Sequence, residues 1–477
     1  MLDVTIKGAQ CVLPGGVCIA DIGIKDGIIA CIGELDNLLT SRVIEAEGKI
    51  VTPGGIEAHA HIWEPMHKGW TDGREEWLPT PEEVTRAALF GGTTTVASFA
   101  FMDTHSTEVF YNTAGAVEAR RRIFDKHSYT HYVFHPVLTG EPSDETIGSI
   151  KEAIREGTTT FKIFTTDVTS KQSGIRIETG SMLAIMRELD KHGGMLMVHA
   201  EDDELVRYME AKLKSDGIDH ACNLNFAHSA LSEGIAFNKV LQLARAAGSA
   251  TFFAHVTARE GLAQIRAAKA AGQAVYGEVL HNYLVFSNED YHKKDGVRFH
   301  TYPAMKDPED REALWHALAE GTLNMVSTDE YTTPYSTKIS GQTLETACGG
   351  LNGIETRGIV IFSEGYKKGR LTVERFADVF STSPAKVLGL YPKKGEIQVG
   401  SDADLVIWNP DIEKTITLAD LHQPSDYSIY EGMEITGWPV TVLLDGKIAV
   451  ENGKLLTSPT DGRFIKRSLA GEILGKE

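Results

Sequence analysis

Residues 51–62 read VTPGGIEAHAHI, and this stretch decides how the rest of the chain is interpreted. A Pro-Gly-Gly turn signal precedes a short apolar segment that ends in His59 and His61. Side chains of a β-strand alternate between its two faces, so two histidines one residue apart lie on the same side. A strand that brings two imidazoles to one point at its C-terminal end can supply half of a metal site. A pair of buried, hydrogen-bonded histidines would give the same pattern, so further ligands are needed.

Downstream of residue 53, short apolar segments alternate with longer helical ones, which is typical of βα units. The predicted strands are Gly55–Ile62, Thr94–Ala100, His131–Leu138, Thr158–Phe164, Met195–His199, Thr251–Val256, Ala274–Val279 and Leu323–Ser327. The predicted helices between them are Thr80–Phe90, Gly180–Lys191, Ser232–Ala247, Ala258–Ala271 and Pro308–Glu320. Eight alternating units, with no glycine-rich phosphate loop after an early strand, favour an α/β fold of the (β/α)8 TIM-barrel type over an open doubly wound sheet.

Both ends of the chain are predicted to form strands instead. Turn signals separate the expected strands Val4–Ile6, Val17–Ala20, Ile22–Ile24, Ile28–Ala30, Lys49–Thr52, Asp404–Trp408, Val440–Asp445 and Lys447–Val450. We expect the two ends to combine into a small β-sandwich beside the barrel. The expected domains are 1–52 and 396–460 for the sandwich, 53–395 for the barrel, and a polar C-terminal tail over 461–477 that forms an arm or a subunit contact.

The composition indicates a globular protein without a nucleic-acid or membrane partner. The chain has 477 residues, 42% hydrophobic and 24% charged, and a formal net charge of −19. Nucleic acids and anionic membranes require basic surfaces, so this charge argues against both. The five cysteines show no CxxC spacing and indicate free thiols in a reducing compartment. With no signal peptide or membrane-spanning run recognised, we expect a cytoplasmic protein.

Active sites of such barrels lie at the C-terminal ends of the strands. Besides the two histidines, the expected strand ends carry four further candidates: Lys162, His199, His255 and Asp329. Taken singly, a histidine such as His199 or His255 is more often structural than a ligand, and Asp329 could cap a loop. Lys162 is harder to explain that way, because lysine is almost never buried unpaired in an apolar strand. Together, four histidines, one lysine and one aspartate at successive strand ends indicate a shared site.

These residue types fit a pair of metal ions. Neutral imidazoles suit zinc, and a carboxylate adds anionic character. Two metals roughly 3.5–4 Å apart need a bridging anion, and a lysine that has added carbon dioxide becomes a carbamate, which resembles a bidentate carboxylate. A water bridging the two ions would have a pKa lowered to about 7 and would be hydroxide at neutral pH. Asp329 could take its proton and pass it to a leaving nitrogen.

At this point the sequence resembles the amidohydrolase superfamily, and within it the cyclic amidohydrolases, dihydropyrimidinase and hydantoinase. The resemblance covers essentially the whole chain. Its motifs are VTPGGIEAHAHI, GGTTTVASF (91–99), FKIF (161–164), MVHAED (197–202), AHVT (254–257), VYGEVLHNYL (275–284), FSTSPAKVLGLYPKKGEIQVGSDADLVIWNP (380–410) and DYSIYEGMEITGWPVTVLLDGK (426–447). The ligand motifs indicate the superfamily, and the C-terminal stretches narrow it to the hydantoinase branch.

The resemblance implies a complete metal site and an assembly. His59, His61 and Asp329 would hold one zinc ion, and His199 and His255 the other. Lys162, as N6-carboxylysine, would bridge them. A barrel with a β-sandwich and a homotetramer are also implied.

The resemblance also implies which residues contact the substrate, but several of these positions differ from the family pattern. The family's oxyanion-donating tyrosine, five residues after the bridging lysine, is replaced by Asp167, near the hydroxyls of Thr165, Thr166 and Thr169. The family's ring-contacting serine and asparagine would correspond to Thr301 and to Gly349 or Asn352. Phe164, by family position, and Trp63, in a loop that also holds Trp70 and Trp77, could line a pocket for an apolar group. Packing of this loop against a neighbour explains the tryptophans equally well. The expected substrate contacts are therefore Phe164, Asp167, Thr301, Asn352 and Trp63.

The leading hypothesis is a binuclear zinc enzyme that opens a hydantoin-like, dihydropyrimidine-like or related imide ring by attack of metal-bridged hydroxide. An allantoinase-like or acyclic amide hydrolase on the same site remains open because Asp167 removes the expected oxyanion donor. A non-catalytic paralogue that acts by interaction is a third alternative. The intact set of candidate ligands argues against it.

Overall fold

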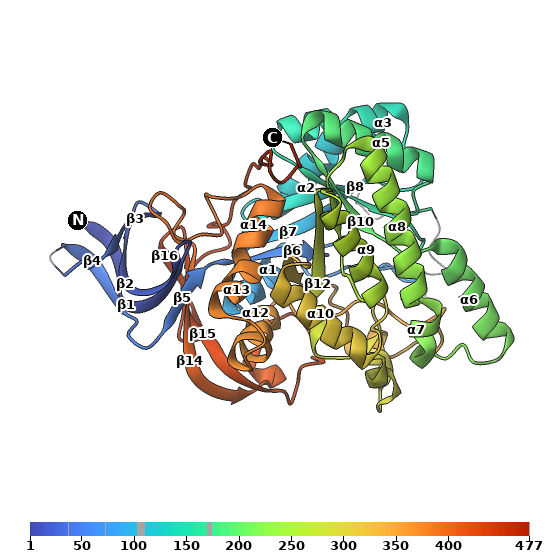
Figure 1. Ribbon diagram of the computed structural model, residues 1–477. Coiled ribbons are helices and arrows are strands. Elements are labelled where there is room, and N and C mark those ends of the chain that lie inside the picture. The colour runs from blue at the N-terminus through green and yellow to red at the C-terminus, as the bar shows by residue number, and fades with distance from the viewer. Residues whose placement is uncertain (37, 72, 103–109, 169–173, 477) are drawn as a thin grey trace.

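A closed barrel of parallel strands forms the body of the molecule (Figure 1). The computed structural model describes the chain except for residues 37, 72, 103–109, 169–173 and 477. The strands are β6 (Gly55–Ala60), β7 (Thr93–Phe101), β8 (His131–Val137), β9 (Thr160–Phe164), β10 (Met195–His199), β11 (Thr251–Phe253), β12 (Val275–Leu280) and β13 (Met325–Ser327). Each pairs with its sequence neighbour, and a bridge between Ala60 of the first strand and Glu330, just beyond the last strand, closes the circle. The predicted TIM barrel and its eight strands are confirmed.

Helices cover the outside of the barrel (Figure 1). The helices of the described chain are α1 (Pro81–Phe90), α2 (Thr113–Phe124), α3 (Asp144–Gly148), α4 (Ile150–Arg155), α5 (Thr179–His192), α6 (Asp203–Ser215), α7 (Leu224–Ala227), α8 (Ala230–Ala247), α9 (Arg259–Ala270), α10 (Pro308–Glu320), α11 (Tyr335–Lys338), α12 (Thr356–Val360), α13 (Val373–Ala377) and α14 (Ser383–Leu388). Shorter 3₁₀ turns are η1 (Ala221–Asn223), η2 (His281–Leu284), η3 (Asn288–His292), η4 (Gly296–Phe299) and η7 (Leu418–Asp420), and π-helical turns are η5 (Ile361–Lys367) and η6 (Asp378–Thr382).

Local sequence explains where these helices begin and end. Thr80 and Glu83 form a reciprocal capping box at the start of α1, followed by a proline at its first turn. Helices α8 and α10 end at Gly248 and Gly321, both in the left-handed conformation that glycine adopts without strain. All five predicted helices are confirmed, whereas α2 and α6 were not predicted. In the described part of the chain, no helix has the length and apolar character needed to cross a bilayer.

The two chain ends form one sheet beside the barrel (Figure 1). Its strands are β1 (Leu2–Leu13), β2 (Gly16–Lys25), β3 (Ile28–Gly33), β4 (Thr40–Glu45), β5 (Ile50–Pro53), β14 (Leu405–Thr415), β15 (Glu434–Leu444), β16 (Lys447–Glu451) and β17 (Lys454–Leu455). Strand β5 pairs with β1 on one side and with β14 on the other, so it joins the two ends. A separate apolar core, including Ile6, Ile24, Val51 and Leu405, belongs to this sheet. The predicted combination of the two ends is confirmed.

Three details of the end sheet differ from the prediction, one of which is that the short strand β17 was not predicted. Val17–Ala20 and Ile22–Ile24 belong to one strand, because the intervening Asp21 accepts backbone hydrogen bonds from Gly8 and Leu35 and does not end it. Strand β4 was not predicted, because its residues are mostly exposed and show little alternation.

The C-terminal tail packs against the barrel of its own chain. The Phe464 ring stacks on Phe134 with the ring centroids 5.9 Å apart. The buried Arg467 guanidinium donates to the Phe134 carbonyl (2.6 Å) and to the Thr160 hydroxyl (3.0 Å). The tail therefore ties strands β8 and β9 together.

Candidate metal centre at the barrel mouth

The barrel brings all six predicted ligands to its C-terminal end. His59 and His61 come from the end of β6, Lys162 from β9, His199 from the end of β10, and His255 and Asp329 from the residues just after β11 and β13. They line one cavity of about 760 Å³, measured out to its open mouth. His255 (φ 36°) and Asp329 (φ 51°) both adopt left-handed backbone conformations. Such conformations are strained for non-glycine residues and are concentrated at functional sites.

Asp329 lies between the two histidines of β6. Its Oδ1 is 2.9 Å from Nε2 of His59 and 3.3 Å from Nε2 of His61. One ligand atom each from His59, His255 and Asp329 lies within 4.8 Å of the others. Ligands bound at about 2.0–2.2 Å to a tetrahedral zinc ion lie roughly 3–3.5 Å from one another. The spacing of these atoms therefore fits one metal centre to which all three side chains contribute.

Carboxylates behind the histidines set which ring nitrogen is available. Nδ1 of His59 is 2.6 Å from Glu278, and Nδ1 of His61 is 2.7 Å from Glu64. A proton held on each Nδ1 leaves the Nε2 lone pairs directed at the Asp329 carboxylate. These lone pairs and the negatively charged carboxylate repel each other unless a cation lies between them. This set of donors therefore fits a metal ion.

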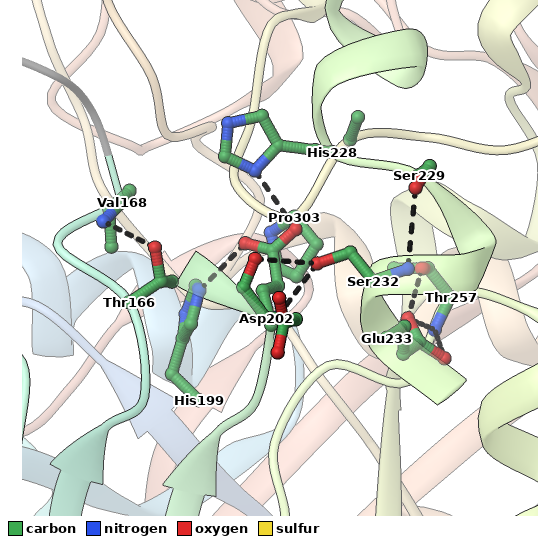
Figure 2. Close-up of polar contacts among 12 residues, drawn as sticks. Thr166, Val168, His199, Asp202, His228, Ser229, Ser232, Glu233, Thr257 and Pro303 are labelled. Carbon is green, nitrogen blue, oxygen red and sulfur yellow. Dashed lines mark hydrogen bonds and ion pairs between the residues drawn. The ribbon is translucent and has the colours of Figure 1, made fainter. Parts of the chain in front are cut away.

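His199 is oriented in the opposite sense. Its Nε2 is 3.0 Å from Glu201, whose other oxygen is 2.9 Å from Nδ1 of His228. Figure 2 shows the rings of His199 and His228 on either side of this contact. All three side chains are buried, and the arrangement leaves Nδ1 of His199 for a metal. Sequence reasoning missed Glu201, although it lies within the quoted MVHAED motif.

Lys162 is 1% exposed and packs between two aromatic rings. Its Nζ is 5.5 Å from the ring centroid of Phe99 and 5.2 Å from that of Phe164. Burial lowers the pKa of Lys162 to about 8, although Asp329 and Glu278 favour the charged form. A lysine that readily loses its proton supplies the neutral amine that reacts with carbon dioxide, which fits the predicted carbamate.

The charges of the other ligands also suit metal binding. Burial disfavours the Asp329 carboxylate, but His59 and His61 outweigh it and hold the pKa of Asp329 well below its usual range. Burial, with His199 and Lys162 nearby, holds the pKa of His255 well below its usual value. Burial lowers the pKa of His61, but the carboxylates of Glu64 and Asp329 outweigh burial and raise this pKa to about 9 in the metal-free protein. The site thus combines an ionised carboxylate with imidazoles that have carboxylate partners.

Asp167 occupies the sequence position of the family tyrosine but has a structural role. Its Oδ1 accepts hydrogen bonds of 3.0–3.1 Å from the backbone N–H groups of residues 174–176. Its Oδ2 is 2.7 Å from the Arg207 guanidinium. The carboxylate closes the segment after β9 on itself and is not among the cavity-lining residues. The Thr165 and Thr166 hydroxyls are bonded to residues 199–203, and Thr169 lies outside the described residues.

Of the other predicted substrate contacts, only Phe164 lines the described cavity. Trp63 packs on Trp77, with the ring centroids 5.3 Å apart. Thr301 is buried beside the Tyr283 hydroxyl. Asn352 donates to the Ser425 hydroxyl (2.7 Å) and the Tyr427 carbonyl (3.0 Å). The side chains of Trp63, Thr301 and Asn352 therefore contact other protein groups and do not line this cavity, and their assignment to the substrate stays a prediction.

Other residues form the wall of this cavity. Besides the ligands and Phe164, it is lined by Glu64, Pro65, His67, Trp70, Phe101, Val168, Ile175, Tyr302, Tyr331, Gly349 and Gly350. Sequence reasoning named Trp70 but missed the two tyrosines, which come from loops after different strands. Among the described lining residues, Lys162 is the one lysine or arginine.

A second group of ligand-like side chains lies apart from the cavity, where β8 meets the end sheet. His131, Asp404 and Asp445 offer ligand atoms within 4.8 Å of one another. Lys394 is 2.5 Å from Asp404, and Arg463 is paired with Asp445. These cations already compensate the carboxylates, so the group is a buried ion-pair network.

Comparison with known proteins agrees with this geometry. The model of the amidohydrolase family matches residues 50–449. The D-hydantoinase of Ralstonia pickettii is 32% identical over 470 residues, which cover 98% of this chain and 99% of that protein. The dihydropyrimidinase of Rattus norvegicus is 29% identical, covering 99% and 90% of the two chains. A crystal structure of a D-hydantoinase superposes with a TM-score of 0.90 at 31% identity and covers 98% of this chain and 99% of its own.

Proposed function

We propose that this chain, which belongs to the amidohydrolase family and within it to the hydantoinase and dihydropyrimidinase branch, is a binuclear zinc hydrolase that opens the amide bond of a cyclic ureide or imide. One observation carries the proposal. Four histidines, Lys162 and Asp329 converge from five strands of the barrel on one cavity. Homologues named D-hydantoinase and dihydropyrimidinase support the choice of a cyclic amide.

The ligands divide into two groups. His59, His61 and Asp329 would hold one zinc ion, and His199 and His255 the other. Lys162, carboxylated to N6-carboxylysine, would connect them, because its Nζ lies among these ligands at the barrel mouth. Zinc ions bound there would act as Lewis acids and lower the pKa of water to about 7.

Asp329 is the proposed proton carrier. It is ionised and lines the cavity, so it can accept a proton from the attacking water. As the hydroxyl adds to the ring carbonyl and the carbon–nitrogen bond breaks, Asp329 returns that proton to the leaving nitrogen.

Tyr302 is the proposed donor to the developing oxyanion in place of the missing family tyrosine. Its ring lines the cavity, and among the described residues its buried hydroxyl has no hydrogen-bond partner. Tyr302→Phe should lower kcat by about 10²-fold or more with little change in metal content. An unchanged kcat would show that another group stabilises the oxyanion.

The residues that line the cavity favour a substrate ring with an uncharged exocyclic group. Trp70, Phe101 and Phe164 present aromatic surface. No arginine is present among the described lining residues to pair with a substrate carboxylate. Rings with apolar substituents should therefore react better than a ring that carries a carboxylate, such as dihydroorotate.

The resemblance also supports a homotetrameric assembly. Phe226 of α7 and Leu231 and Ile235 of α8 are exposed apolar side chains on neighbouring helices. Such a surface is one that a subunit contact would bury. Light scattering on the purified protein tests this assembly.

A ring-opening panel tests the proposed function. Dihydrouracil, 5-substituted hydantoins, allantoin, succinimide, phthalimide and dihydroorotate should be compared at fixed zinc concentration, with metal content measured on the same preparation. We expect about two zinc ions per chain and turnover of at least one uncharged ring. Less than one metal per chain with no ring opened would favour a non-catalytic role.

A further inference from the structure

Lys338, the last residue of α11, is completely buried on the substrate side of the barrel mouth. Its ammonium donates to three backbone carbonyls: His300 at 2.6 Å, Cys348 at 2.8 Å and Gly350 at 2.5 Å. A lysine ammonium has three donors, and all three are used. Among the described residues, no carboxylate forms an ion pair with it. This charge is therefore balanced by carbonyl dipoles alone.

The three carbonyls belong to two segments that lie far apart in the sequence. One segment, residues 300–303, supplies Tyr302 to the cavity wall, and the other, residues 348–350, supplies Gly349 and Gly350. The segments are in close contact, since a Cβ on Gly349 would lie 2.4 Å from a ring carbon of Tyr302. The Trp70 ring lies parallel to the Tyr302 ring, with the two ring centroids 6.4 Å apart. The two segments therefore form one continuous part of the cavity wall.

We propose that Lys338 is a positioning residue whose ammonium holds residues 300–303 and 348–350 together as one wall of the active-site cavity, so that substrate binding depends on its charge. This inference rests on the proposed function of the same cavity. Lys338 is not among the residues that line the cavity, so it acts through Tyr302 and the two glycines.

Loss of the Lys338 proton should loosen the wall at mildly alkaline pH. Burial lowers the pKa of Lys338 to about 8, and the neutral amine keeps only two donors for three carbonyls. The ionisable groups that face it are His300, whose pKa burial holds well below its usual value, and Cys348, whose pKa burial raises. Neither group carries a charge at neutral pH that could replace the ammonium.

The test compares Lys338→Met with a matched control, Lys269→Met. Lys269 also donates to two carbonyls and an amide oxygen, those of Gly321, Thr322 and Asn324, and burial also lowers its pKa to about 8. It joins α9 to the loop before β13, away from the cavity wall. Lys338→Met should raise KM for the best ring substrate about tenfold or more, since each hydrogen bond to a charged group contributes substantially. Metal content should stay unchanged, and kcat should fall as KM rises because the same wall carries Tyr302, whereas Lys269→Met should leave KM and kcat unchanged.

Two further measurements keep the proposal testable. For a ring that does not itself ionise, such as dihydrouracil, wild-type KM should rise above about pH 8, and in Lys338→Met it should be flat. Amide hydrogen exchange over residues 300–303 and 348–350 should be faster in Lys338→Met than in wild type or Lys269→Met. That readout needs no substrate, so it separates failure of this inference from failure of the proposed function. A folded Lys338→Met with wild-type KM and wild-type exchange would overturn the inference, and if this variant does not fold, a wild-type KM independent of pH would do so.

Discussion

Glu57 connects the two strands that carry the ligands of one proposed metal. Its Oε1 accepts hydrogen bonds from the backbone N–H groups of His59 (2.9 Å) and Thr328 (3.1 Å), and Thr328 directly precedes Asp329. Its Oε2 is 3.1 Å from Nε of Arg357, and both side chains are fully buried. Glu57 thus fixes the backbone beneath His59 and Asp329 at the same time. We expect metal binding to depend on it.

Glu57→Gln keeps the shape of the side chain but changes one acceptor into a donor. If the amide oxygen keeps the bonds to His59 and Thr328, the amide N–H₂ group faces the N–H of Arg357. If the amide is reversed, both backbone bonds are lost. The first arrangement loses the buried ion pair with Arg357, and the second loses both hydrogen bonds to the carboxylate. A hydrogen bond to a charged group contributes about 1.5–3 kcal/mol, and we expect a cost of this order in either case. At about 1.4 kcal/mol per tenfold change, metal affinity should fall roughly 10- to 100-fold, as for other residues that orient metal ligands.

The assay is the zinc content of the protein after equilibration against a graded series of chelator concentrations. Glu355→Gln is the matched control, because Glu355 is equally buried and pairs with His422 away from the metal centre. The Glu57→Gln midpoint should move to lower chelator concentration, and added zinc should restore much of the lost activity. A midpoint equal to that of wild type and of Glu355→Gln would refute the role of Glu57.

The remaining predictions concern the ligands and the ion-pair network. Lys162→Ala should lose nearly all activity and about half of its metal, and short carboxylic acids should partly restore activity; full activity without them would contradict the bridge. Asp329→Ala should lower kcat by about 10²–10⁴-fold and reduce bound metal much less, and an unchanged kcat would rule out proton transfer by Asp329. Lys394→Met should leave Asp404 without its buried cation and cost about 3–5 kcal/mol of stability, which a lower denaturation midpoint measures.

The barrel and its candidate ligands could be predicted because their signals are local. Each barrel strand is a short apolar run bounded by turn residues, and each ligand lies at a fixed place near the end of its run. Lys162 was recognised because a charged side chain within FKIF has no simple structural explanation. Strand ends in a barrel meet at one mouth, so placing the ligands in sequence also placed them in space.

Helices α2 and α6 were missed because charged residues occupy much of each sequence, although their buried positions recur at helical spacing. In α6, only Val206 and Leu213 are buried, although Asp202 caps its first turn. The substrate wall was missed for a different reason. Lys338 lies in the polar segment YSTKISG, which resembles an exposed loop, and its three acceptors are backbone carbonyls that carry no sequence signal. Asp167 likewise became interpretable only when its backbone partners were known.

Metal binding and ring selection should be separable in this protein. Glu57 fixes the backbone beneath the ligands, whereas Lys338 holds the wall that faces the substrate, and no described hydrogen bond or ion pair connects the two side chains. Effects of mutations without shared partners usually add in free energy. The double variant Glu57→Gln, Lys338→Met should therefore show the chelator sensitivity of the first change and the raised KM of the second, each at its single-variant size. With zinc in excess, a KM increase much smaller or larger than that of Lys338→Met alone would show that the wall and the metal support are one coupled unit.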